Sequence, residues 1–408
     1  MGYVDLKYLP GSSDLVCEYL IGPGKGFSLA AAAEQVAAES SVGTWTEVKT
    51  SNKRIMKMAA RVFSIDSKNS IVKIAYPSEL FEQGNASQIL SSIAGNIYGM
   101  RAVRSLRLND VSIPKSIAKS FPGPELGLKD IRKIAKVKSR PLAGTIYKPK
   151  VGLRPREMAE LAYMIYSAGI DYSKDDENLG SMSFNKFEER VVLILNATDR
   201  IKSEQGRSVI YAPNITAPAD EMLNRAEFVK RHGGKCIMID VVSCGISSLQ
   251  FIRKQNLKMI IHAHRAGHAA FTRNRAHGIS MLAYSKFLRL CGVSALHTGT
   301  VVGKMEGSQE DVVALDNFLR ARWNAKKEVM PIASGGLHPG LVGKLVNILG
   351  KDIIINFGGG LWGHPSGPEA GARAIMQSID AAVSGVSARN YAKHHAELRT
   401  AINKWGCE

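Results

Sequence analysis

The chain has 408 residues, of which 45% are hydrophobic and 22% are charged, as is usual for a globular protein. No apolar run approaches the roughly 18 residues that cross a bilayer, and the first residues, MGYVDLKYLP, lack a signal-peptide pattern. We therefore expect that the protein does not span a membrane, is not secreted and is not disordered. The net charge of +18 favours anionic partners such as nucleic acid or phosphorylated small molecules.

The cysteines are few and scattered, and none forms a CxxC pair. This usage predicts reduced thiols in the cytoplasm, with neither a disulfide framework nor a zinc site. The five positions are Cys17, Cys236, Cys244, Cys291 and Cys407.

Residues 1–122 are predicted to form a small α+β domain. Helical patterns occupy Leu29–Ala38 and Ser87–Ile93. The resulting order, β-α-β-β-β-α-β, is close to a ferredoxin-like fold. The Pro- and Gly-rich segment Ile113–Gly127 marks the domain boundary. The stretches that predict strands are Leu15–Ile21, Thr44–Val48, Ile55–Ile65, Ile71–Tyr76 and Tyr98–Leu108.

Residues 123–408 alternate between short apolar runs and longer helical patterns, as in a (β/α)8 TIM barrel. An open doubly wound sheet is the structural alternative, although it rarely needs eight consecutive units. Helices over Ala370–Ile402 follow the last unit. The eight predicted strands are Leu142–Tyr147, Ile170–Lys174, Val209–Ala212, Cys236–Asp240, Met259–His262, Ala295–His297, Val329–Ala333 and Ile353–Phe357. The predicted helices between them include Pro155–Ala168, Phe187–Ser203, Pro218–Arg231, Met281–Leu290, Gln309–Arg320 and Leu341–Leu349.

The second predicted barrel strand ends in Lys174, followed by Asp175, Asp176 and Glu177. A period of two places Lys174 and Asp176 on one face, pointing inward at the end of the barrel where active sites lie. Neighbouring carboxylates need a cation, and oxygen ligands favour Mg²⁺. A lysine that has reacted with CO₂ would add an anionic oxygen. A plain ion-pair cluster is the commoner outcome of this residue pattern.

Two glycine clusters, at 334–336 and 358–360, follow the seventh and eighth predicted strands, where this fold usually binds phosphate. Arg265 and His297 could form a second pocket that binds an anion. Lys304 lies in a Gly-rich stretch, 299–307, that predicts a mobile lid. Tight turns and a solvated lysine are the alternative interpretations. We do not expect a zinc site at His264 and His268, because no third ligand has suitable spacing.

With these residues in place, the chain resembles the large subunit of ribulose-1,5-bisphosphate carboxylase/oxygenase (RuBisCO) over essentially its full length. The compact form without a small subunit, as in archaea, is the most similar. The matching segments are AAESSVGTWT (37–46), GNIYGMRAVRSLRL (95–108), GTIYKPKVGL (144–153), GIDYSKDDENLGS (169–181), HAHRAGHAA (262–270), HTGTVVGKMEGS (297–308), ASGGLHPG (333–340) and NFGGGLWGHPSGP (356–368).

This resemblance implies carboxylation, and competing oxygenation, of ribulose 1,5-bisphosphate through a Mg²⁺-stabilised enediolate, with 3-phosphoglycerate as the product. It implies that Lys174 is carbamylated by an activator CO₂ and binds Mg²⁺ together with Asp176 and Glu177. The implied catalytic residues are Glu39, Asn96, Lys148, Lys150, Lys174, His264 and Lys304. One phosphate would bind Thr44, Trp45, Gly336, Gly358 and Gly359, and the other Arg265, His297 and Ser334.

The resemblance also implies that residues 1–122 cap the active site of a partner, so that the unit is a homodimer or an assembly of dimers. No small subunit, nucleic acid or membrane partner is expected. The compact form implies a role in AMP and nucleoside salvage. Two departures from plant-type sequences are Ile146 in place of threonine and Ala295 in place of histidine.

Two other functions remain open at this stage. A RuBisCO-like enolase or isomerase acting on a related sugar phosphate would keep the barrel and the modified lysine. A basic nucleic-acid-binding protein would use the lysines and arginines of residues 129–140, which have no aromatic side chains among them.

Overall fold

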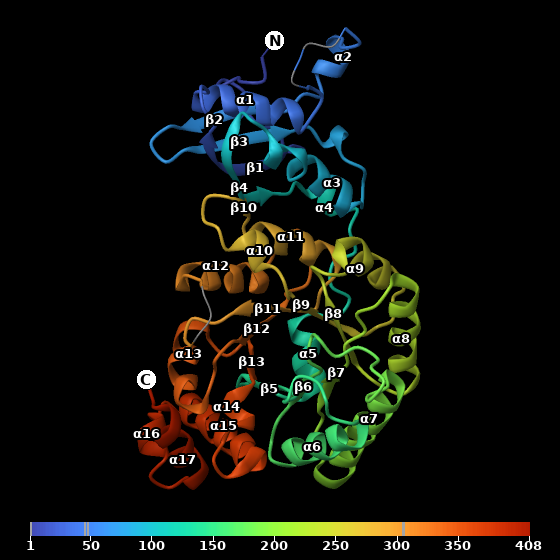
Figure 1. Ribbon diagram of the computed structural model, residues 1–408, viewed down its shortest axis with the longest axis vertical. Coiled ribbons are helices and arrows are strands. Elements are labelled where there is room, and N and C mark those ends of the chain that lie inside the picture. The colour runs from blue at the N-terminus through green and yellow to red at the C-terminus, as the bar shows by residue number, and fades with distance from the viewer. Residues whose placement is uncertain (1, 45, 47–48, 304–306) are drawn as a thin grey trace. The chain divides into compact units, whose positions relative to one another are not determined.

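A computed structural model describes residues 2–44, 46, 49–303 and 307–408. The chain forms two compact units (Figure 1). The smaller unit contains the residues up to Gly123 together with Gly267–Cys291, and the larger contains Pro124–Ala266 and Gly292–Glu408. The segment Gly267–Cys291 therefore clusters with the smaller unit, although it lies within the range predicted as the barrel domain. The predicted domain limits, 1–122 and 123–408, stay predictions.

The smaller unit is built on a five-stranded sheet in the order β10-β4-β1-β3-β2. Side chains of β1 alternate between buried and half-buried, so that Leu15, Cys17, Tyr19 and Ile21 enter the core. The antiparallel pairs of β1 with β3 and β4, and of β2 with β3, give the expected ferredoxin-like arrangement. The strands are β1 (Leu15–Pro23), β2 (Arg61–Asp66), β3 (Ile71–Tyr76), β4 (Val103–Ser112) and β10 (Gly278–Ile279).

The helices of the smaller unit confirm the two predicted ones, with α1 beginning where Ser28 caps its first turn. The helical elements are α1 (Leu29–Glu39), α2 (Lys53–Met56), η1 (Ser78–Leu80), α3 (Ala86–Ile93), η2 (Asn96–Gly99), α4 (Lys115–Ala118), α10 (Ala269–Thr272) and α11 (Met281–Cys291).

Three of the predicted strands in this unit were wrong in whole or in part. In the predicted strand Thr44–Val48, Thr44 and Thr46 lie in no strand. The other three positions, 45, 47 and 48, are outside the described residues. The stretch Ile55–Ile65 begins in α2, because Asn52 caps a helical turn there, and its strand starts only at Arg61. The stretch Tyr98–Leu108 begins in η2. Apolar spacing alone did not separate short turns from strands at these positions.

The larger unit is a barrel of eight parallel strands, all at the predicted positions, with hydrogen-bonded order β7-β6-β5-β13-β12-β11-β9-β8. The ring closes between β7 and β8 through a parallel bridge from Asn214 to Met238. Continuous apolar runs form these strands because both of their faces are covered. The strands are β5 (Leu142–Ile146), β6 (Tyr172–Lys174), β7 (Ile210–Ala212), β8 (Cys236–Asp240), β9 (Ile260–His264), β11 (Ala295–Gly299), β12 (Met330–Ser334) and β13 (Ile354–Phe357).

Helices surround the strands, as Figure 1 shows. The Pro155 ring begins α6, where its missing N–H costs nothing, and Ser308 caps α12. The helical elements are α5 (Leu128–Ala135), α6 (Pro155–Ser167), α7 (Phe187–Gln205), α8 (Ala219–Arg231), α9 (Gly245–Lys254), α12 (Gln309–Arg320), η3 (Pro339–Leu341), α13 (Val342–Leu349), α14 (Gly359–Trp362), α15 (Gly367–Val383), α16 (Ala388–Tyr391) and α17 (Ala396–Trp405).

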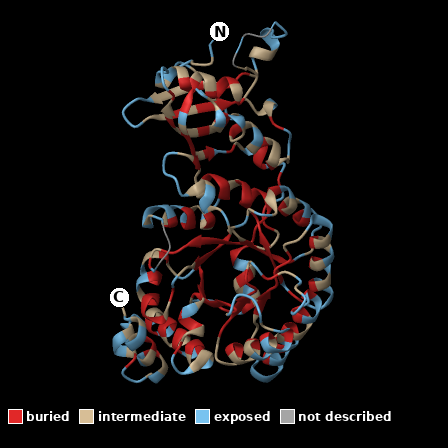
Figure 2. Ribbon diagram, viewed as in Figure 1, coloured by how far each residue is buried: buried red, intermediate tan, exposed pale blue. Residues whose placement is uncertain are grey.

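The amino-terminal end of the barrel is filled by one apolar cluster. Leu128 and Ile131 of α5 pack there against the first residues of the strands, including Leu142, Ile210 and Met330. Figure 2 shows the ring of strands as almost entirely buried, and only the last residues of β9 and β12, His264 and Ser334, are half-buried. The carboxyl ends of the strands are therefore the end at which polar side chains can meet a ligand.

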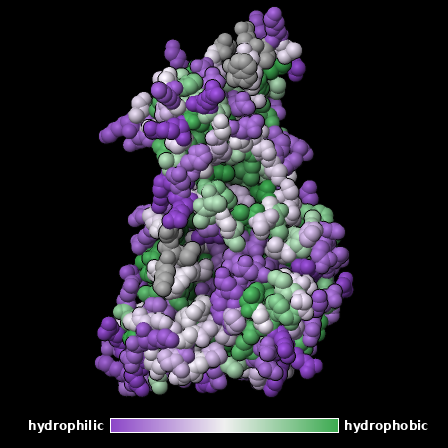
Figure 3. All heavy atoms as spheres, in the orientation of Figure 1, coloured by the Kyte–Doolittle hydropathy of each residue, from purple (hydrophilic) through white to green (hydrophobic). Residues whose placement is uncertain are grey.

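The outer helices of the larger unit present mainly hydrophilic side chains on the face drawn in Figure 3. Large apolar side chains that are exposed, such as Phe184, Phe251 and Val386, lie in separate parts of the chain, Phe251 in α9 and the other two in loops. Among the residues that the structure describes, no helix combines the length and the apolar character needed to cross a bilayer.

Candidate active site

The carboxyl end of β6 brings a lysine against a carboxylate inside the barrel. The Lys174 Nζ lies 3.2 Å from Glu177 Oε2 and donates to the Asp175 carbonyl at 2.9 Å. The Lys174 side chain is 1% exposed, whereas Glu177 keeps 21% of its side chain exposed. Glu177 therefore forms the boundary between the buried amine and the mouth of the barrel.

Burial lowers the pKa of Lys174, although Glu177, Asp176 and Asp240 oppose this shift. Burial alone would raise the pKa of Glu177, but the charge and hydrogen bond of Lys174 outweigh it and hold this pKa at about 2. The site thus combines a buried lysine whose pKa is lowered with a carboxylate whose pKa is held below its usual value.

Asp176 lies on the same side of the chain as Lys174 and is fully buried. Its Oδ2 accepts from Lys148 Nζ at 2.9 Å, and its Oδ1 accepts from the Asn178 side chain at 2.9 Å. Lys148 follows β5, so two neighbouring strands supply this ion pair. The Lys148 side chain is 28% exposed and can reach the barrel mouth.

Asp175 stands between Lys174 and Asp176 in the sequence, and its side chain points away from theirs. Its Oδ2 accepts from Arg190 Nε at 3.1 Å and from the Asn214 backbone N–H at 2.9 Å, while its Oδ1 accepts from the Tyr211 hydroxyl at 2.6 Å. Arg190 comes from α7, outside the strands. The predicted alternation along Lys174, Asp175 and Asp176 is thus observed, and Asp175 fixes the backbone that presents its two neighbours.

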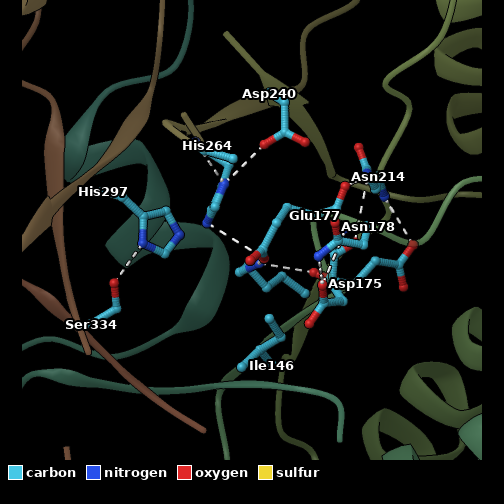
Figure 4. Close-up of polar contacts among 12 residues, drawn as sticks. Ile146, Asp175, Glu177, Asn178, Asn214, Asp240, His264, His297 and Ser334 are labelled. Carbon is cyan, nitrogen blue, oxygen red and sulfur yellow. Dashed lines mark hydrogen bonds and ion pairs between the residues drawn. The ribbon is translucent and has the colours of Figure 1, made fainter. Parts of the chain in front are cut away.

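His264, at the end of β9, lies between two carboxylates (Figure 4). Its Nδ1 is 2.9 Å from Asp240 Oδ1, and its Nε2 is 3.6 Å from Glu177 Oε2. The Ala266 backbone N–H also points at Nδ1, at 3.2 Å, but the Asp240 oxygen is nearer. Because a carboxylate oxygen accepts, the contact with Asp240 favours a proton on Nδ1 and leaves Nε2 facing Glu177. Sequence reasoning missed Asp240, although its place at the end of the predicted strand Cys236–Asp240 carried the same signal as the other strand ends.

A second group of polar side chains gathers in the middle of β11, at the end of β12 and just after β9. The His297 Nδ1 lies 2.8 Å from the Ser334 Oγ (Figure 4). Burial lowers the pKa of His297 well below its usual value. Burial also lowers the pKa of Arg265 to about 10, against the opposing charge of Asp316. A Cβ on Gly299 would lie 2.8 Å from Arg265 Nη2, so this glycine admits the guanidinium beside β11.

The predicted phosphate glycines lie at the ends of β12 and β13. A Cβ on Gly358 would lie 3.8 Å from Lys148 Cε, which places this backbone next to the Lys148–Asp176 pair. Gly359 has open space where its side chain would be, and Gly336 has a φ of 66° in an exposed turn. Backbone N–H groups of glycine-rich loops suit an anion.

The remaining predicted site residues are not brought into these contacts. Lys150 is exposed in the loop after β5. In the smaller unit, Glu39 ends α1 and is half-buried, Thr44 follows it, and Asn96 begins η2 and is exposed. Trp45 and Lys304 lie outside the described residues.

The side chains that could hold Mg²⁺ are Lys174, Asp176 and Glu177, provided that the lysine is carbamylated. Among the described residues, no group of three His, Cys, Asp or Glu side chains has the arrangement of a metal site. Two carboxylates next to a buried amine nevertheless fit a magnesium ion, since a carbamate on the amine would supply a third oxygen ligand.

Two family models match the chain. The catalytic domain of the ribulose bisphosphate carboxylase large chain matches residues 127–405, and its N-terminal domain matches residues 2–117. The ribulose bisphosphate carboxylase of Pyrococcus furiosus is 47% identical over 410 residues, covering 100% of this chain and 97% of the relative. That of Methanocaldococcus jannaschii is 45% identical over 427 residues, covering 99% and 100%.

Solved structures agree with the sequence matches. The octameric ribulose-1,5-bisphosphate carboxylase/oxygenase from Pyrococcus horikoshii OT3, in complex with sulfate ion, superposes with a TM-score of 0.96 at 46% identity, covering 99% of this chain and 96% of that one. The dimeric archaeal Rubisco from Hyperthermus butylicus gives 0.93 at 41% identity, covering 99% and 98%. The resemblance inferred from the motifs is confirmed, and the chain belongs to the ribulose bisphosphate carboxylase large chain family of enzymes, with archaeal members among its relatives.

Proposed function

We propose that this protein carboxylates ribulose 1,5-bisphosphate with CO₂ to give two molecules of 3-phosphoglycerate, with O₂ as a competing substrate. The observation that carries the proposal is the cluster at the carboxyl end of β6, in which Lys174 contacts Glu177 and Asp176 pairs with Lys148. Membership of the carboxylase family and the archaeal relatives support it.

The residues present fit a magnesium ion and a carbamate. Lys174, Asp176 and Glu177 would hold the ion, with the carbamate on Lys174 Nζ. When bound, the ion would supply a positive charge that stabilises negative charge developing on substrate oxygens. CO₂ adds to the neutral form of an amine, and burial lowers the pKa of Lys174, which makes that form more accessible than in an exposed lysine.

His264 and Lys148 are proposed to move protons at this site. Asp240 holds the His264 Nδ1–H, so the Nε2 lone pair is available to take a proton from a substrate hydroxyl or from water. Lys148 carries three donor hydrogens, one of which is held by Asp176, so it can give a proton to a carbanion. Lys150 would add positive charge to the same end of the barrel.

The two phosphate groups of the substrate are proposed to bind at opposite sides of the barrel mouth. Arg265, His297 and Ser334 would bind one. The backbone of Gly336, Gly358 and Gly359 would bind the other, completed by Thr44 and Trp45. Lys304 would close over the site with Glu39 as its ion partner, and Asn96 would lie near the substrate.

Glu39, Thr44, Trp45 and Asn96 are proposed to act on the barrel of a second copy, which makes a homodimer or an assembly of dimers the working unit. The octameric and dimeric archaeal structures support this proposal. Neither a small subunit nor a nucleic-acid or membrane partner is required. We further propose a cytoplasmic location, supported by five free cysteines, and a role in AMP and nucleoside salvage.

The second candidate is a RuBisCO-like enolase or isomerase. The products formed from ribulose 1,5-bisphosphate and CO₂, identified by NMR, separate the two. The carboxylase gives 3-phosphoglycerate, whereas the alternative exchanges the C3 proton or isomerises the sugar without adding carbon. Lys304→Ala should retain C3 exchange and lose carboxylation, and equal loss of both would assign Lys304 another role.

A further inference from the structure

A line of polar side chains crosses the otherwise apolar interior of the barrel. It begins at Tyr172, the first residue of β6, which lies in the apolar cluster with α5 at the closed end. It continues through His262 in the middle of β9 and His297 in the middle of β11. It ends at Ser334, the last residue of β12, which is half-buried at the open end.

Each neighbour along this line is within hydrogen-bonding distance. The Tyr172 hydroxyl is 2.7 Å from His262 Nδ1, and His262 Nε2 is 2.9 Å from His297 Nε2. His297 Nδ1 is 2.8 Å from Ser334 Oγ. Both ring nitrogens of each histidine are therefore engaged, and the side chains are fully buried or nearly so up to His297.

The contact between the two Nε2 atoms couples the tautomers of the histidines. Burial lowers the pKa of both His262 and His297 well below the usual value, so each ring carries one proton at neutral pH. If His262 donates from Nε2, His297 must accept there and carries its proton on Nδ1, which then donates to Ser334. If His297 donates instead, every hydrogen bond in the line reverses.

The inner end of the line favours the first direction. The Tyr172 hydroxyl carries one proton that it can donate. It can donate to His262 Nδ1 at 2.7 Å or to Cys236 Sγ at 3.3 Å. An imidazole nitrogen is a strong acceptor and a thiol sulfur a weak one, so the proton points toward His262.

We propose that Tyr172 and His262 are positioning residues, which direct the hydrogen bonds outward so that the Ser334 hydroxyl donates its own proton to an anionic oxygen at the barrel mouth. In the reverse direction Ser334 would donate to His297 and present only lone pairs to the anion. The direction set at the closed end thus decides whether the open end attracts or repels a phosphate. The inference rests on the proposed phosphate site at Ser334.

The first test is binding of inorganic phosphate, measured by calorimetry at neutral pH without substrate turnover. Tyr172→Phe and His262→Leu should each raise the phosphate Kd by about five- to tenfold. Each variant removes a donor that directs the hydrogen bonds toward Ser334. His262→Gln should restore most of the affinity, since its amide can accept from Tyr172 and donate to His297. Unchanged affinity in both Tyr172→Phe and His262→Leu would overturn the proposal.

Tyr166→Phe is the matched control. It removes another fully buried hydroxyl, bonded to Tyr147 and Ser173, that lies outside the line. Its phosphate Kd should equal that of the wild type. A loss as large as that of Tyr172→Phe would attribute the effect to general loosening of the barrel and contradict the assignment.

The tautomer of His297 gives a readout that needs no variant. In protein labelled with ¹⁵N in histidine, phosphate-bound His297 should carry its proton on Nδ1, and His262 on Nε2. A proton on His297 Nε2 in the phosphate-bound protein would overturn the proposal. Because neither readout requires carboxylation, a protein that fails to fix CO₂ would disprove the proposed function and leave the hydrogen-bond direction separately measurable.

Discussion

Asp240 and Glu177 hold His264 from its two sides, with Asp240 Oδ1 at 2.9 Å from Nδ1 and Glu177 Oε2 at 3.6 Å from Nε2. The pair sets which nitrogen is free to exchange a proton. In the Asp240→Asn variant, the new amide can donate to Nδ1 of His264, which favours the tautomer with its proton on Nε2. We predict that this variant lowers kcat roughly a hundredfold, the scale of a lost acid–base group.

Steady-state carboxylation assays over a range of pH check this prediction. Asp220→Asn, on the exposed start of α8, is the control and should keep wild-type kcat. If Asp240→Asn retained wild-type kcat and pH profile, His264 would not depend on Asp240 for its tautomer.

Lys174→Met should separate activity from stability. Methionine matches the apolar part of the side chain, but it leaves Glu177 without its ion partner. Because Glu177 keeps 21% of its side chain exposed, the free energy of unfolding should fall by no more than about 1–3 kcal/mol. Carboxylation should fall below detection, because no carbamate can form. Urea unfolding and product assays on the same preparation measure both, with the exposed Lys202→Met as control. Retained turnover would rule out the carbamate.

Asp175→Ala should destabilise the barrel severely. Asp175 and Arg190 are both 0% exposed, and loss of the carboxylate leaves a buried guanidinium without its counter-ion. We expect a loss of about 3–5 kcal/mol in the free energy of unfolding. Glu369→Ala, which removes an exposed ion pair with Arg373, should cost less than about 1 kcal/mol. Similar losses from the two variants would show that burial is not the cause.

Asp316→Asn should stabilise the protein at neutral and alkaline pH. Asp316 is fully buried, and neither of its oxygens has a hydrogen bond of ordinary geometry among the described residues. Burial raises its pKa to about 6 from 3.8, against the opposing effects of Thr298, Arg320 and Arg265. The folded state therefore holds this proton more tightly than the unfolded state, so ionisation lowers stability as pH rises from about 4 to about 6.

The gain from Asp316→Asn should reach about 2–3 kcal/mol at pH 8 and vanish near pH 4, since about 1.4 kcal/mol corresponds to one pKa unit. Urea unfolding at several pH values measures it, with the exposed Asp199→Asn as a control that shows no such trend. A gain that is equal at pH 4 and pH 8 would mean that ionisation of Asp316 is not responsible.

The barrel could be predicted because its strands are buried on both faces and appear as continuous apolar runs, such as Cys236–Asp240. Short elements could not be predicted in this way. β10 has two residues, and its partner β4 lies far away in the sequence, so no local pattern indicates it. The strand predicted at Ile55–Ile65 failed because Asn52 starts a helical turn there.

At the site, the end of β6 was predictable because alternation separates Lys174 and Asp176 from Asp175. The partners of those residues were not. Arg190 is on a helix that follows β6, and Tyr172 resembles any buried aromatic residue until His262 is placed beside it. Pairings between distant segments depend on how the barrel closes, which no local spacing encodes.

The most direct test of the account is the incorporation of isotopically labelled bicarbonate into 3-phosphoglycerate. Purified protein receives ribulose 1,5-bisphosphate after preincubation with Mg²⁺ and CO₂ together, with either alone, or with neither. The account predicts labelled product from wild-type protein preincubated with both, little initial product otherwise, and none from Lys174→Met. An initial rate independent of preincubation, or labelled product from Lys174→Met, would contradict it.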